Sequence, residues 1–188
     1  MIWVAAAILT IFFGVQVFSL VSILQHTDKK LEKRKDFPMV SILLAARNEE
    51  QLILRNLTAI NALNYPKDKL EVLIGNDEST DNTAQLVTDF IKDKPYFKLF
   101  HIDKTVGKGR GKANVLGQLA HKASGEFYFI TDVDVKLPQN WILALLQEFT
   151  EGVGLVSGTT KCERGSLFAT LQSIDWLHFM GYIKAFAN

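Results

Sequence analysis

The chain has 188 residues, 48% of them hydrophobic, and a formal net charge of +1 at pH 7. This length and apolar content are enough for one folded core and exclude a disordered tail, while the near-neutral charge lacks the strongly basic signature of a nucleic-acid-binding domain. A single cysteine, Cys162, excludes an intramolecular disulfide and is compatible with a reducing compartment.

The first 24 residues contain no charged side chain and are long enough to form one helix across a bilayer. A secretory signal peptide usually begins with basic residues, and none precedes this apolar run. Basic residues follow it between positions 29 and 35, and the positive-inside rule keeps such a flank in the cytoplasm. We therefore predict a transmembrane helix at 1–25 and a basic juxtamembrane linker at 26–37. The protein would then lie in the inner or cell membrane, with its downstream domain cytoplasmic, and the alternative is a buried helix of a soluble protein.

From residue 38 onward, short apolar runs alternate with helical patterns, which is typical of a βα fold. The apolar runs predict strands at 39–45, 70–76, 97–102, 126–131 and 153–158. Helices are predicted between them at 49–63, 81–92, 111–123 and 138–150. Nearly continuous apolar strands favour an α/β, Rossmann-like fold, with a mostly parallel sheet and helices on both of its faces. In such a fold, ligands bind at the carboxyl ends of the strands.

Polar segments follow the first four predicted strands. They are AARNEE (45–50), NDESTDNT (76–83), DKTVGKGRGKAN (103–114) and TDVDV (131–135). Each segment alone is also explained as a helix start, a turn or a flexible loop. Because the carboxyl ends of parallel strands meet at one edge of the sheet, we expect the four segments to build one site.

Two of these segments suit a diphosphate and a metal ion. Glycines alternate with basic residues between 107 and 112, which permits close backbone approach and places positive charge beside a helix start. The run is not a Walker loop, because Ala113 stands where that motif needs a hydroxyl residue. Asp132 and Asp134 are two apart, so on a strand they would point the same way, and their carboxylates suit Mg²⁺ or Mn²⁺. We expect the metal ion to bridge to the phosphate oxygens.

With these motifs in this order, residues 38–160 resemble the nucleotide-diphospho-sugar transferase domain of family 2 glycosyltransferases, which have a GT-A fold. The resemblance implies that the segment from Ala45 to Glu49 cradles the nucleoside and that Asp77 contacts the base. It implies that Lys112 lies beside a UDP-linked donor, and that the two aspartates bind ribose and the metal ion. The donor-binding residues implied are Ala45, Arg47, Glu49, Asp77, Lys112 and Asp132. The metal ligands implied are Asp134 and Asp132, with Mg²⁺ or Mn²⁺ as cofactor.

The chain departs from the family pattern in two places. Val115, Leu116 and Gly117 replace an Ala-Leu-Asn run that is frequent in the family, so the resemblance implies no donor-sugar contacts at these positions. The acidic pair that supplies the general base is missing downstream, as is the Gln-x-x-Arg-Trp motif of processive members. The catalytic base is therefore not identified: Asp175 is a weak candidate, and the sequence favours a polar-face residue of a helix at this position. We expect the chain to end before the acceptor-side motifs.

The last segment, 161–188, is predicted to be an apolar helix at the start of the acceptor region. It either packs on the sheet or lies at a membrane interface. The expected activity is metal-assisted, inverting transfer of a sugar from a nucleotide-diphospho-sugar to a lipid or saccharide acceptor. The alternative is a truncated, non-catalytic module that only binds the nucleotide sugar. A nucleotidyltransferase or a dehydrogenase would need a glycine-rich loop after the first strand. The segment at this place, AARNEE, contains no glycine, which argues against both classes of enzyme.

Overall fold

The structure, a computed structural model, describes residues 2–24, 36–158, 160 and 165–187. The chain forms two compact units. A sheet unit comprises Leu31–Gly154, and a two-helix unit comprises Met1–Lys30 and Leu155–Asn188. Each unit has its own internal contacts.

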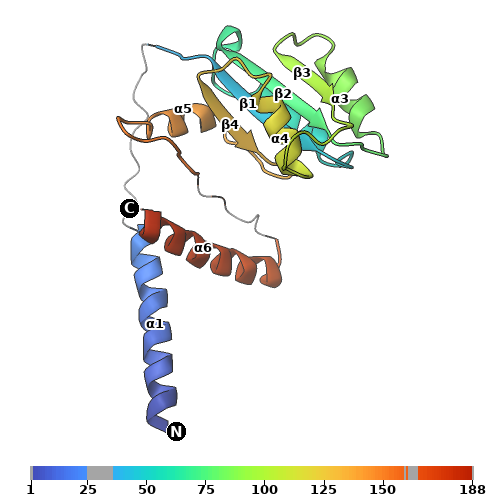
Figure 1. Cartoon of the computed structure of the whole chain (residues 1–188). Coiled ribbons are helices and arrows are strands. Elements are labelled where there is room, and N and C mark those ends of the chain that lie inside the picture. The colour runs from blue at the N-terminus through green and yellow to red at the C-terminus, as the bar shows by residue number, and fades with distance from the viewer. Residues whose placement is uncertain (1, 25–35, 159, 161–164, 188) are drawn as a thin grey trace. The chain divides into compact units, whose positions relative to one another are not determined.

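Four parallel strands form the sheet of the first unit (Figure 1). They are β1 (Val40–Ala46), β2 (Leu70–Asn76), β3 (Phe97–His101) and β4 (Phe127–Thr131), in the order β3-β2-β1-β4. The register pairs Leu44 of β1 with Ile74 of β2 and with Thr131 of β4. Since every neighbouring pair is parallel, the carboxyl ends of all four strands lie along one edge, and the predicted parallel α/β fold is confirmed.

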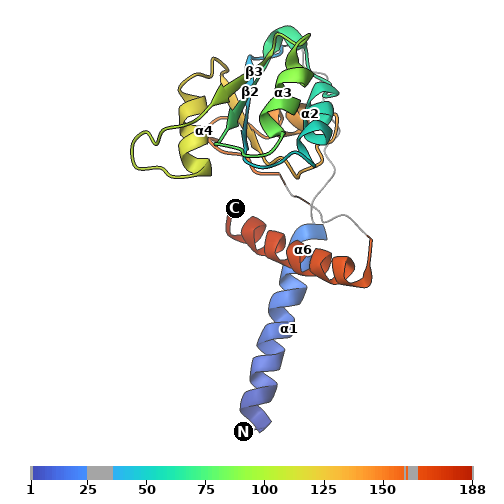
Figure 2. The same ribbon diagram turned by 90° about the vertical axis from the view of Figure 1, so that its right-hand side faces the viewer.

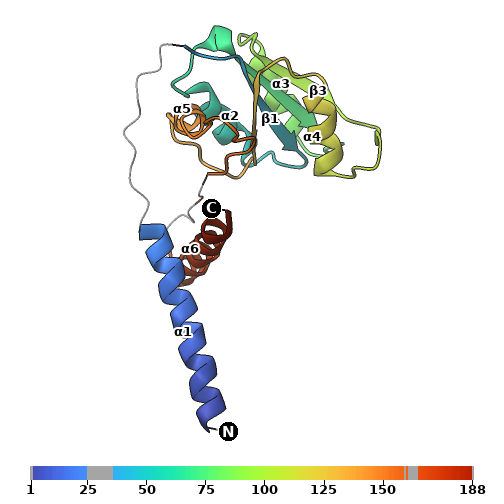
Figure 3. The ribbon, with the colours of Figure 1, turned by 60° about the vertical axis from the view of Figure 1, so that its left-hand side comes forward.

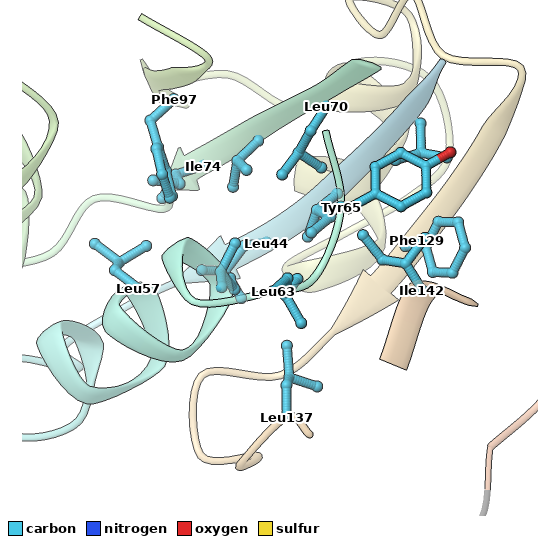
Figure 4. Close-up of a cluster of buried hydrophobic side chains, with 14 of the residues drawn as sticks. Leu44, Leu57, Leu63, Tyr65, Leu70, Ile74, Phe97, Phe129, Leu137 and Ile142 are labelled. Carbon is cyan, nitrogen blue, oxygen red and sulfur yellow. The ribbon is translucent and has the colours of Figure 1, made fainter. Parts of the chain in front are cut away.

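Helices cover both faces of this sheet (Figure 2). They are α2 (Ile53–Asn61), α3 (Thr83–Ile91), α4 (Lys112–Ala120) and α5 (Trp141–Leu146), with a short 3₁₀ turn, η1 (Lys67–Lys69). The larger core lies under α2, α3 and α5, where Leu57 and Ile142 pack with Leu44 of the sheet (Figure 4). These three side chains are at most 1% exposed, so this face supplies most of the apolar burial that stabilises the unit.

The helix α4 covers the opposite face, over a smaller core that contains Leu43, Leu73 and Leu119. A Cβ atom at Gly75 would lie 2.3 Å from Cγ1 of Val115, so only glycine lets α4 pack this closely on β2. This packing holds the first turn of α4 near the end of β2.

One predicted strand does not form. Residues 153–158 have no regular secondary structure, and Leu155 is 87% exposed. An apolar run becomes a strand only when a neighbouring strand takes up its backbone hydrogen bonds, and no such pairing exists for this run in the described part of the chain. The prediction of a fifth strand was therefore wrong.

The two-helix unit consists of α1 (Ile2–Leu24) and α6 (Leu167–Ala187), which contact each other (Figure 3). Crossing a bilayer takes about 20 consecutive apolar residues in one helix. Over the residues that the structure describes, no helix combines the length and the apolar character that this requires. This finding overturns the predicted transmembrane helix at 1–25 and the location in the inner or cell membrane that followed from it. Residue 25, residues 26–35 of the predicted linker, and Cys162 lie outside the described residues.

Candidate functional site

A pocket of about 450 Å³ opens at the carboxyl edge of the sheet. It is lined by Ala45, Ala46, Arg47, Glu49, Asp77, Gly111, Lys112, Asp132, Val133 and Asp134. All seven residues that the sequence singled out for donor and metal binding are in this set. They come from segments up to 89 positions apart and meet because the strands are all parallel, so that their carboxyl ends lie along one edge of the sheet.

The register of β1 and β2 creates the first charged pair of the pocket. Ala46 lies opposite Asn76, so the next residues along the chain, Arg47 and Asp77, are also neighbours. The Asp77 amide donates to the Ala46 carbonyl oxygen at 2.9 Å, and Arg47 Nη1 lies 3.5 Å from Asp77 Oδ2. The Asp77 side chain is 17% exposed against 59% for Arg47, which leaves the guanidinium accessible to an incoming ligand.

The loops after β1 and β2 are joined by a set of hydrogen bonds between residues 48–50 and 79–83, here called the cross-loop clasp. Asn48 has a positive φ of 55°, which turns the chain sharply after Arg47. Its Oδ1 accepts the Thr80 amide at 2.8 Å, and its own amide donates to Ser79 Oγ at 3.0 Å. These bonds fix the distance between the two loops that carry Arg47 and Asp77.

The rest of the clasp satisfies the backbone at the start of α2 and α3. The amides of Glu49 and Glu50 donate to Thr83 Oγ1 at 2.7 Å and to Asp81 Oδ2 at 3.2 Å. In return, Glu50 Oε2 accepts the Asn82 amide at 3.1 Å. Burial acts to raise the pKa of Asp81, but hydrogen bonds from Thr83 and from the Glu50 amide outweigh it and lower the pKa. The two loops therefore behave as one rigid wall of the pocket.

The second charged pair joins α4 to the segment after β4. Gly111, with a φ of 52°, places Lys112 at the first position of α4. The Lys112 ammonium forms an ion pair with Asp132 Oδ1. Both side chains are about half exposed, at 50% and 52%, so solvent screens the pair and a ligand can replace either partner.

The glycine-rich loop before α4 is anchored at its base. Asn114 Oδ1 accepts the Val106 amide at 2.8 Å, and Asn114 Nδ2 donates to the Lys104 carbonyl oxygen at 3.0 Å. Lys108 and Arg110 are exposed and do not line the pocket, unlike Lys112 of the same basic run.

Asp132 and Asp134 lie in a turn and not on a strand. The strand β4 ends at Thr131, so the alternation of strand side chains does not explain why both carboxylates face the pocket. The explanation lies in the turn, where buried Val133 points inward between two exposed aspartates. The Asp134 carboxylate makes no hydrogen bond or ion pair with any residue that the structure describes, so it is available to a ligand.

Two residues that hold this turn escaped the prediction from sequence. Arg55 Nη2 donates to the Asp134 carbonyl oxygen at 2.9 Å. Asn56 Nδ2 donates to the carbonyl oxygens of Asp132 and Val135, at 3.0 and 3.1 Å. The sequence does contain a signal for Asn56. This polar residue lies on the apolar face of a helical pattern, and a polar side chain at such a position indicates a buried hydrogen bond.

The donor set at this turn fits a metal ion that arrives with a phosphate ligand. Among the described residues, no cluster of three or more His, Cys, Asp or Glu side chains could hold a metal by itself. Mg²⁺ is usually bound by one or two carboxylates together with water and substrate phosphates. Asp132 and Asp134 supply two such carboxylates on one pocket wall.

Asp175, the candidate base, is not part of this constellation. It lies on α6 in the two-helix unit, where it lines a pocket of about 370 Å³ together with Gln16, Trp176, His178, Phe179 and Tyr182.

Comparison with known proteins gives consistent matches. The family model "Glycosyl transferase family 2" matches residues 41–186. The chain is 36% identical over 110 residues to the probable glycosyltransferase YdaM of Bacillus subtilis, covering 58% of this chain and 26% of that protein. It is 30% identical over 148 residues to the poly-β-1,6-N-acetyl-D-glucosamine synthase of Staphylococcus epidermidis, covering 77% of this chain and 34% of that protein. The chain thus spans about a quarter to a third of the length of these relatives.

Among solved structures, the mannosyltransferase PcManGT from Pyrobaculum calidifontis, in complex with GDP-Man and Mn²⁺, is similar at a TM-score of 0.63. The sequence identity is 27%, and the match covers 76% of this chain and 42% of that one. The similarity supports a GT-A-like fold for the sheet unit.

Proposed function

The chain belongs to glycosyl transferase family 2, and on this basis we propose that its sheet unit binds a nucleotide-diphospho-sugar whose sugar the protein transfers, with inversion, to an acceptor hydroxyl. One observation carries the proposal: seven residues from the ends of β1, β2 and β4 and the start of α4 line a single pocket. We propose a UDP-linked donor and a saccharide acceptor, either free or linked to a lipid.

The wall formed by the loops after β1 and β2 binds the nucleoside. Ala45, Arg47 and Glu49 cradle it, and Asp77 accepts a hydrogen bond from the base. Because the cross-loop clasp fixes both loops, these groups are held in place before the donor arrives, which reduces the entropy lost on binding.

The opposite wall binds the diphosphate. Asp134 and Asp132 would hold Mg²⁺ or Mn²⁺, which when bound supplies positive charge to the departing diphosphate. The solved mannosyltransferase, in complex with GDP-Man and Mn²⁺, supports this choice of cofactor. When Asp132 turns to ribose or metal, its ion pair with Lys112 opens and the ammonium becomes free to bind a phosphate oxygen.

The acceptor side of the transfer needs a general base. Among the described residues that line the pocket, all four carboxylates (Glu49, Asp77, Asp132, Asp134) are already assigned to the donor. This observation also favours the alternative, a module that binds the nucleotide sugar without completing the transfer.

Calorimetric titration of the full chain tests the proposal. UDP, UDP-sugars and GDP-mannose are titrated in the presence of Mn²⁺ and then with excess chelator. We expect saturable binding of a UDP ligand that is lost on chelation, and absence of binding in every arm would refute the proposed site. A wild-type chain that binds the donor but transfers no sugar would favour the binding module.

A further inference from the structure

Asn56 is a buried polar residue in an apolar environment. It is 1% exposed, and on the same face of α2 the side chains of Ile53, Leu57 and Ile60 are fully buried. An amide group at such a position loses its hydrogen bonds to water, so it persists only where protein groups replace them.

The replacement comes from the turn that carries the two aspartates. Asn56 Nδ2 donates to the carbonyl oxygens of Asp132 and Val135, at 3.0 and 3.1 Å. Carbonyl oxygens only accept hydrogen bonds, so the orientation of the amide group is determined by its partners. Within the turn, the bond from the Val135 amide to the Asp132 carbonyl is long, at 3.3 Å, and the turn is therefore held mainly from α2.

The same helix is tied to the nucleoside wall. Its first amide, that of Ile53, donates to the Glu49 carbonyl oxygen at 2.9 Å. Next to Asn56, Arg55 binds the Asp134 carbonyl oxygen at 2.9 Å from the exposed side. One helix thus connects the segment after β1 with three carbonyl groups of the turn after β4.

The asparagine also has an unfavourable feature. The Asn56 Oδ1 atom is buried and has no hydrogen-bond partner in the part of the chain that the structure describes. A leucine would fill a similar volume and remove this unpaired acceptor, but it would leave the carbonyl oxygens of Asp132 and Val135 without their donor. The geometry points to a need for the two donated hydrogen bonds, strong enough to outweigh the unpaired oxygen.

We propose that Asn56 is a positioning residue for the metal-binding turn. By holding the carbonyl groups of Asp132 and Val135, it orients the carboxylates of Asp132 and Asp134 and so sets the affinity of the pocket for a divalent cation. The inference rests on the proposed function, because it assumes that these carboxylates bind the metal.

The test is a titration of the full chain with Mn²⁺, in which electron paramagnetic resonance measures the concentration of free Mn²⁺. The titration is made with UDP, with GDP and without nucleotide. Asn56→Asp keeps the shape of the side chain but places an acceptor opposite two carbonyl oxygens. The matched control is Asn61→Asp on the same helix, where Asn61 Oδ1 accepts from the Tyr96 hydroxyl, a bond that an aspartate can keep. Thermal unfolding shows whether each variant is folded.

We expect Asn56→Asp to weaken Mn²⁺ binding about tenfold or more, as is typical when an outer-shell partner of a metal ligand is lost. Asn61→Asp should bind Mn²⁺ like the wild type. If Asn56→Asp does not fold, Arg55→Ala removes a bond to the same turn from the exposed side and should weaken Mn²⁺ binding in the same direction.

The inference would be overturned if the folded Asn56→Asp variant bound Mn²⁺ as tightly as the wild type. If Asn56→Asp does not fold, the same result for Arg55→Ala would overturn it. Either result would leave the proposed function untouched. An equal loss in the Asn61 control would also overturn the inference, because the effect would then be general to α2. A wild-type chain that binds no Mn²⁺ with either nucleotide would refute the proposed function, and the inference with it.

Discussion

Carboxylates lie at both ends of the same sheet, but their surroundings are opposite. At the amino end, Glu71 of β2 is 3% exposed and accepts hydrogen bonds from Ser41 Oγ at 2.6 Å and from the Ser124 amide at 2.5 Å. Lys98 Nζ adds an ion pair at 3.1 Å. At the carboxyl end, Asp134 is exposed and its carboxylate binds no residue that the structure describes.

The comparison separates two uses of one chemical group. Burial acts to raise the pKa of Glu71, but the hydrogen bonds from Ser41, Ser124 and Lys98 outweigh it and lower the pKa to about 2. The Glu71 carboxylate accepts hydrogen bonds from protein groups, so it joins β1, β2 and β3 and stabilises the scaffold. A carboxylate whose lone pairs remain open can bind an external cation. Residue type therefore does not identify the site, whereas available acceptor capacity does.

Asp134→Ala is the sharpest way to test the carboxyl end. Loss of a direct ligand should exceed the roughly 10- to 100-fold effect of an outer-shell partner, so we expect metal-dependent donor binding to become undetectable by calorimetry. The free energy of unfolding, measured in urea, should change by less than about 0.5 kcal/mol because the carboxylate is exposed. Unchanged donor binding would refute the assignment of Asp134 as a metal ligand.

Glu71→Ala tests the amino end and should show the reverse pattern. Three donor residues lose their common acceptor, and we expect a loss of about 3 kcal/mol in the free energy of unfolding at pH 7. Donor affinity of the folded fraction should be retained. The control is Glu126→Ala, at an exposed glutamate just before β4, which should shift stability by less than about 0.5 kcal/mol. Equal unfolding curves for the two variants would contradict the role of Glu71.

The pH dependence of stability should carry the signature of Glu71. Its pKa is about 2 in the folded chain against a usual value of 4.5, so the folded state favours the ionised form. The resulting contribution, about 3 kcal/mol, is fully present above pH 4.5 and is lost as the pH falls toward 2. Urea unfolding of the wild type and of Glu71→Gln across this range measures it. A difference between the two that stays constant from pH 5 to pH 2 would be inconsistent with the shift.

The strands and the pocket were predictable because their signals are local. The predicted strand 70–76 is β2 residue for residue, since a strand buried on both faces is mostly apolar. The polar segments after the strands lie where the topology of parallel sheets puts them. Helix starts were less accurate: α2 begins at Ile53 and not at Glu49, because the cross-loop clasp engages the intervening residues in a turn.

The contacts that the sequence did not predict join residues far apart along the chain. The hydrogen bonds of Asn56 reach residues 76 and 79 positions away, and those of Glu71 reach residues 30 and 53 positions away. No local pattern encodes such pairs. The run 153–158 has strand-like composition but lacks a neighbouring strand, and the apolar composition of 1–25 suggested a membrane span that the described helices do not support.

Lys112→Met tests the half-exposed pair of the pocket and should have an intermediate effect. Because a solvent-exposed ion pair contributes about 0–1 kcal/mol, the free energy of unfolding should barely change. Donor affinity should fall about tenfold, since a charge-assisted hydrogen bond to the diphosphate is lost. Lys108→Met, in the same basic run but outside the pocket lining, is the matched control. An equal loss in both variants would indicate general electrostatic attraction instead of a specific contact.

Substitution of Asn48 should have the smallest effect on donor affinity. Asn48 combines the two roles compared above, because it belongs both to the scaffold and to the pocket wall. Asn48→Gly keeps the positive φ of 55° and removes only the two hydrogen bonds that Asn48 Oδ1 accepts from the Thr80 amide and hydroxyl, for a loss of about 1 kcal/mol in stability. Asn48→Ala should lose roughly a further 1 kcal/mol through backbone strain. Urea unfolding and donor titration of both variants separate the two contributions. If the variants lose stability but do not lose donor affinity by a few-fold, the cross-loop clasp, like Glu71, only stabilises the fold. The clasp would then not preorganise the pocket wall for the donor.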